Sequence, residues 1–135
     1  MQVLIIIVIA LHVMAATFWA GSTFALARLG GAAAGPLFRP QMGAATVAIA
    51  TGTLLWWFLH EGLFGAPEMV LGAGALAALA AVAIQATAIG PVHGQLGAGQ
   101  GAEASAAPAR VAIGHRAAAG LLAITALSMA VARFV

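Results

Sequence analysis

The chain has 135 residues, of which 64% are apolar and only 6% are charged, and its mean hydropathy is +1.10. Soluble domains carry about a quarter charged residues, so this composition excludes a soluble globular protein and indicates an integral membrane protein. The absence of cysteine excludes disulfides, iron–sulfur clusters and thiolate metal sites, and five arginines against three glutamates predict no binding of nucleic acid.

The first apolar run, residues 3–29, predicts a transmembrane helix that is retained in the mature protein. It is too long for the hydrophobic region of a signal peptide, and no basic segment precedes it. A helical period places His12 on one stripe with Ala16, Trp19 and Thr23. Because an ionisable side chain inside a bilayer is costly, we expect this stripe to face other helices and to have a function.

A second span is predicted over residues 41–63, after a loop at 30–40 that is rich in glycine and proline. Ala44, Ala48 and Gly52 repeat every four residues in this span. Small residues at this spacing let membrane helices approach closely, so the second span is expected to have a packing face.

The third span is predicted over residues 69–89 and contains one strongly polar residue, Gln85. Its amide either joins helices by hydrogen bonds or lines a cofactor. The longest loop, 94–108, is composed mainly of glycine and alanine, and the last span follows at 109–134 with His115 in its second turn.

These four spans predict an all-α fold, a single four-helix transmembrane bundle over residues 1–135 in the lipid bilayer. Four arginines flank the loops that join spans one to two and three to four: Arg28, Arg39, Arg110 and Arg116. Positive charge favours the cytoplasmic side, so both termini are expected outside, in the inner (plasma) membrane of a bacterium. The small-residue ridges also make a homo-oligomer an open expectation.

Histidine is the main ionisable residue apart from arginine, which suggests that imidazoles bind a cofactor between helices. From the helical rise, His12 lies about 14 Å and His60 about 4 Å below the outer boundary, while His115 lies about 9 Å from the cytoplasmic boundary and His93 at it. The possible pairs differ in depth by about 8–10 Å, an offset that helix tilt can absorb, so none is favoured over the others. The alternative is that His60 and His93 are interfacial, His115 reaches the headgroups, and His12 is hydrogen-bonded to Thr17 or a carbonyl.

The first span also suggests a family. It has Leu11 and His12, then Trp19, Ala20 and Gly21 after six residues, and it ends with Arg28 and Leu29. This pattern resembles the HemJ-type protoporphyrinogen oxidases, small membrane proteins that bind haem b, and more broadly the copper-resistance D-like group. The resemblance implies a haem-binding four-helix scaffold in which His12 is the residue most directly carried over, followed by His93. The HemJ-type pattern includes a lysine, and this chain has none.

We therefore expect a haem b held by His12 and a second histidine, used in electron transfer or porphyrinogen oxidation with a membrane redox partner. The expected metal ligands are His12, His93 and His115. Arg28 and Arg116 either pair with haem propionates or only set the topology. The alternatives are an accessory subunit of a larger membrane complex and a copper-handling protein. The residues expected to contact the cofactor are His12, His60, His93, His115, Trp19, Arg28 and Arg116.

Overall fold

A computed structural model describes residues 1–30, 34–60, 62, 65–92 and 102–135, with the backbone alone for 102–107. Its long helices are α1 (Gln2–Leu29), α2 (Ala34–Leu59), α3 (Ala66–Ile84) and α4 (Ala102–Val131). A π-helical segment, Gln85–Ile89, continues α3, and a 3₁₀ turn, Ala132–Phe134, ends α4. The predicted all-α four-helix membrane bundle is confirmed.

The four helices are long and apolar enough to cross a bilayer. The apolar spans cover 28 residues in α1, 26 in α2, 24 in α3 with its π-helical extension, and 27 in α4 from Pro108. About 20 residues suffice to cross the hydrocarbon of a membrane. The protein is therefore a multi-pass membrane protein.

Two helices, α2 and α4, begin about two turns earlier than the sequence predicts. The expected loop 30–40 contains the start of α2 at Ala34, and the expected loop 94–108 contains the start of α4 at Ala102. Pro36 lies in the first turn of α2, where backbone amides have no intrahelical acceptor, so a proline costs little there. Pro40 and Pro108 lie inside their helices, where each removes one hydrogen bond but does not end the helix.

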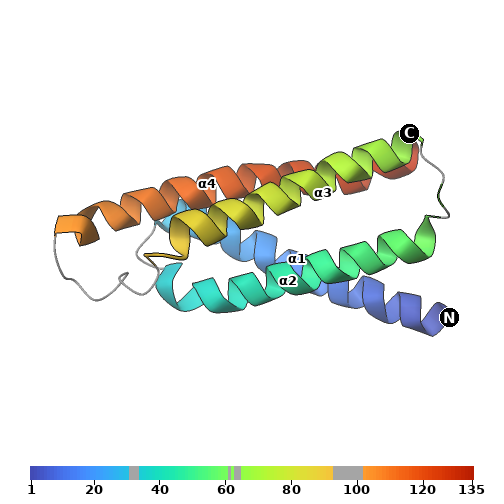
Figure 1. Ribbon diagram of the computed structural model, residues 1–135, viewed down its shortest axis with the longest axis horizontal. Coiled ribbons are helices and arrows are strands. Elements are labelled where there is room, and N and C mark those ends of the chain that lie inside the picture. The colour runs from blue at the N-terminus through green and yellow to red at the C-terminus, as the bar shows by residue number, and fades with distance from the viewer. Residues whose placement is uncertain (31–33, 61, 63–64, 93–101) are drawn as a thin grey trace.

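The helices form two closely packed pairs, α1 with α2 and α3 with α4, and α1 also packs against α4. In Figure 1, α3 and α4 lie side by side, and α1 passes obliquely from α4 towards α2. Both termini lie at one end of the bundle (Figure 1). The opposite end contains the C-terminal end of α1 and the N-terminal ends of α2 and α4 (Figure 1). Arg28 lies in the last turn of α1, and Arg39 and Arg110 lie in the N-terminal parts of α2 and α4, so these three arginines are on the side of the bundle opposite the termini.

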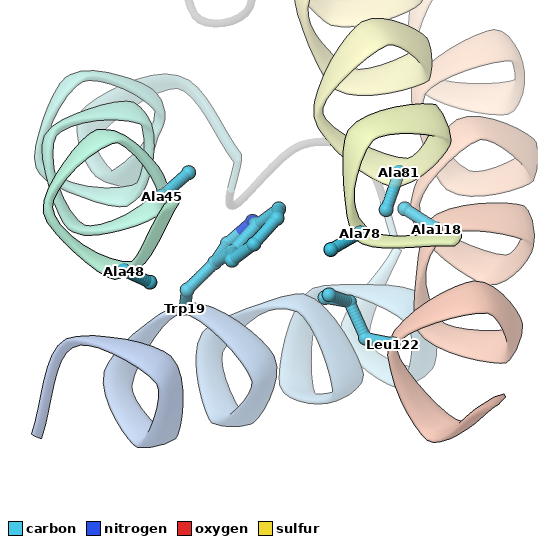
Figure 2. Close-up of a cluster of buried hydrophobic side chains, with 7 residues drawn as sticks. All are labelled: Trp19, Ala45, Ala48, Ala78, Ala81, Ala118 and Leu122. Carbon is cyan, nitrogen blue, oxygen red and sulfur yellow. The ribbon is translucent and has the colours of Figure 1, made fainter. Parts of the chain in front are cut away.

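The space between α2 and α3 is filled mainly from α1, because the two helices contact each other only sparsely. The indole of Trp19 extends from α1 between the alanines of α2 and those of α3 (Figure 2). Most of its neighbours are too small to fill this space themselves, so one large ring supplies the volume that close packing needs. This cluster comprises Trp19, Ala45, Ala48, Ala78, Ala81, Ala118 and Leu122.

Candidate functional site

His12 is held at the contact between α1 and α2 by its Nδ1 atom. This nitrogen lies 2.9 Å from the carbonyl oxygen of Ala48 and 3.1 Å from the hydroxyl oxygen of Thr51. A carbonyl only accepts hydrogen bonds, and the Thr51 hydroxyl donates its own proton to the carbonyl of Val47 at 2.6 Å. Nδ1 is therefore the donor, and the neutral imidazole carries its lone pair on Nε2.

A glycine makes room for this imidazole. A Cβ atom added at Gly52 would lie 3.1 Å from Cε1 of His12, closer than most Cβ contacts, and 3.5 Å from its Nδ1, which is ordinary van der Waals contact. The predicted small-residue ridge of α2 thus contacts α1 here, through Ala48 and Gly52. The expectation that His12 bonds to Thr17 or a carbonyl is correct only for the carbonyl.

The other ring nitrogen of His12 has no hydrogen-bond partner among the residues that the structure describes. The ring is only partly buried. An imidazole whose Nδ1–H bonds to a backbone carbonyl, with Nε2 free, has the tautomer and orientation of a metal-ligating histidine. With Nδ1 as the donor, Nε2 of His12 is able to bind a metal ion or to accept a hydrogen bond.

A second group of polar side chains crosses the bundle farther along α1. Four polar residues, one from each of the four membrane spans, have 0% exposure. We call them the polar layer: Thr23, Gln41, Gln85 and His115. Along each helix the polar residue separates two apolar clusters. One is the cluster around Trp19 described above, and the other comprises Leu26, Ala34, Ile89 and Val111.

Hydrogen bonds join three of these side chains to Trp19. The indole Nε1 donates to Oε1 of Gln85 at 2.7 Å, and Nε2 of Gln85 donates to the Thr23 hydroxyl at 2.9 Å. Nε2 of Gln41 donates to the same hydroxyl at 2.8 Å, and that hydroxyl donates to the Trp19 carbonyl at 2.7 Å. The interpretation that the Gln85 amide joins helices by hydrogen bonds is confirmed, and its partners on α1 are Trp19 and Thr23.

His115 is the fourth member of the polar layer, and it is unpaired. Both of its ring nitrogens are buried and have no hydrogen-bond partner within the described part of the chain, and the same is true of Oε1 of Gln41. The alternative in which His115 reaches the headgroups is wrong, because the ring has no exposed surface. Since α4 begins at Ala102 rather than near residue 109, His115 lies deeper in the helix than the sequence predicts.

The structure does not bring His12, His60 and His115 together. Thr23, in the layer of His115, is eleven residues beyond His12, which corresponds to about 16 Å along α1. His60 lies just after α2, stacked on Trp56 with ring centroids 4.7 Å apart and with Nε2 3.8 Å from Glu68.

The third expected ligand, His93, lies outside the described residues. Across the rest of the chain that is described, no three histidine, aspartate or glutamate side chains converge on a metal site. Of the candidate ligands, His12 and His115 are described and lie apart, and a pairing of either with His93 stays a prediction.

The expected propionate partners lie far from His12. Arg28 and Arg116 line one groove on the outer side of α1 and α4. Arg28 is sixteen residues beyond His12, about 24 Å along the helix axis, which is longer than the distance from the iron of a haem to its propionates. This groove therefore lies well along α1 from His12.

Two residues of these sites are not identified by the sequence reasoning, Gln41 and Thr51. Both are polar side chains within an apolar span, which was an available signal, but neither forms a motif with its neighbours in sequence.

Comparison with known proteins gives no match among family models, curated proteins or solved structures. The resemblance to HemJ-type oxidases therefore stays a prediction that rests on the motif of the first span.

Proposed function

We propose that the protein binds a b-type haem through Nε2 of His12 and acts in electron transfer or porphyrinogen oxidation in the inner membrane of a bacterium. The observation that carries the proposal is the hydrogen bond from Nδ1 of His12 to the carbonyl of Ala48. It selects the tautomer that presents a lone pair at Nε2, and it fixes the plane of the ring. Because Gly52 has no Cβ atom, the imidazole fits against α2 without a steric conflict.

When bound, a haem supplies one-electron redox chemistry, and the chain supplies the ligand and the surroundings. Thr51 and Ala48 would hold the imidazole against rotation. The apolar side chains around α1 would exclude water and so influence the reduction potential. The proposal places both termini outside, because Arg28, Arg39 and Arg110 lie at the opposite end of the bundle.

A visible spectrum of the detergent-purified protein tests this proposal. The expected result is a Soret band with sharp α and β bands on reduction, and its loss in His12→Ala. His60→Ala is the matched control, because His60 lies at the end of α2 near Glu68 and should keep wild-type haem content. Wild-type haem content in His12→Ala would exclude His12 as a ligand.

The same measurement distinguishes the proposal from the other function classes. A featureless spectrum of the wild-type protein, with no metal found by elemental analysis, would favour a cofactor-free accessory subunit. Copper in stoichiometric amount without a Soret band would favour copper handling. A variant of His93, measured in parallel, would test whether His93 is the second axial ligand.

A further inference from the structure

Two arginines from different helices meet in one groove on the outer surface of the bundle. The groove has a volume of about 360 Å³ and lies between α1 and α4. Arg28 belongs to the last turn of α1, and Arg116 reaches across from α4. The lining residues are Phe24, Ala27, Arg28, Arg116, Ala119 and Gly120.

The two positive charges have no acidic partner in the described part of the chain. The one ion pair there joins His60 to Glu68, beyond the other end of α2. Arg116 uses its Nε–H to donate to the carbonyl oxygen of Ala27 at 3.5 Å, which leaves its terminal nitrogens free. Two neighbouring guanidinium groups repel each other, and an anion between them removes that repulsion and satisfies their donors.

The rest of the groove is apolar and faces the lipid side of the bundle. Phe24 is exposed, and a Cβ added at Gly120 would meet no atom within 4 Å, so the surface there is open. A ligand that fits must therefore combine a negative charge with a hydrocarbon chain. Basic pockets between transmembrane helices bind the headgroups of anionic lipids in this way.

We propose that this groove binds an anionic phospholipid, with its phosphate between Arg28 and Arg116 and an acyl chain over Phe24, Ala27 and Gly120. Guanidinium groups suit this role because each can donate two parallel hydrogen bonds to phosphate oxygens. Arg28 lies next to the end of the apolar α1 span, which is the depth at which headgroup phosphates lie. The site is independent of haem binding at His12.

Native mass spectrometry of the delipidated protein in a neutral detergent, titrated with phosphatidylglycerol, tests the proposal. We expect Arg28→Gln with Arg116→Gln to weaken binding by at least about ten-fold, from the loss of charged hydrogen bonds. The matched control is Arg39→Gln with Arg110→Gln, which removes the same charge from the same end of the bundle. It should change the affinity by less than about two-fold.

Two further arms identify the source of the phosphate. Phosphatidylcholine should bind more weakly than phosphatidylglycerol, and inorganic phosphate at equal concentration should not displace the lipid. If the glutamine double variant does not fold, Arg28→Lys with Arg116→Lys keeps both charges but should still weaken binding by losing the paired hydrogen bonds. Equal losses in the groove and control variants, or displacement by inorganic phosphate, would overturn the proposal.

Discussion

The indole nitrogen of Trp19 donates a 2.7 Å hydrogen bond to the side-chain oxygen of Gln85, linking α1 to the start of the π-helical segment after α3. Both side chains are buried, so neither polar group has water as an alternative partner. Gln85 and Ile89, the first and last residues of this segment, are both fully buried, so the Gln85 amide lies on the inner face where it meets the indole.

Removing the indole donor should destabilise the bundle. Trp19→Phe leaves Oε1 of Gln85 unpaired and should lower the free energy of unfolding by about 1–2 kcal/mol. Unfolding in mixed micelles of a mild detergent and dodecyl sulfate measures this change. Trp57→Phe is the control, because Trp57 is 81% exposed and should shift the value by less than about 0.5 kcal/mol. Equal effects of the two substitutions would contradict the role of the Trp19–Gln85 bond.

Adding a methyl group beside His12 should weaken haem binding if the proposed function is correct. In Gly52→Ala the new Cβ lies 3.1 Å from Cε1 of His12, so the ring must shift away from the Ala48 carbonyl. Loss of such a supporting contact should reduce haem affinity about ten-fold, as measured by haem titration of the apoprotein. Gly43→Ala, on the same helix with open space around it, should leave the affinity unchanged. A loss in both variants would point to a general effect on α2.

Two glycines of α3 should respond in opposite ways to alanine. A Cβ at Gly74 would lie 2.8 Å from the Cβ of Ser128, where α3 contacts α4, and the Gly74 carbonyl accepts a 2.9 Å hydrogen bond from Thr125. Gly74→Ala should therefore cost about 1–3 kcal/mol of unfolding free energy. Gly72 has open space, so Gly72→Ala should be neutral or stabilise by up to about 1 kcal/mol. Comparable stabilities of the two variants would show that the contact between α3 and α4 accommodates an added methyl group.

Replacing the unpaired imidazole of the polar layer should stabilise the protein. His115→Leu removes two buried nitrogens that have no partner, and it should raise the free energy of unfolding by about 1 kcal/mol. The same micelle titration measures the change, and the visible spectrum should remain that of the wild type. A destabilised variant would indicate that His115 binds a group in the native protein, and lost haem absorbance would make it an axial ligand.

The positions of the spans were largely predictable from the sequence, but their first turns were not. Residues 3–29 were predicted as the first span and α1 covers Gln2–Leu29, because partition into a bilayer depends on the composition of each segment alone. The sequence does not indicate the start of α2, because Pro36 and Pro40 are typical of a loop. A proline is readily accommodated in the first turn of a helix, and Pro40 was tolerated at the cost of one hydrogen bond.

The sequence by itself determined that the chain crosses a membrane, that it does so as four helices, and that His12 lies on an inward stripe with Trp19 and Thr23. Only the tertiary structure decided which groups these side chains meet. The Ala48 carbonyl lies 36 residues from His12, and Gln85 lies 66 residues from Trp19. Such pairs depend on the rotation and crossing of whole helices, which are set by the close packing of many small residues and not by any local pattern.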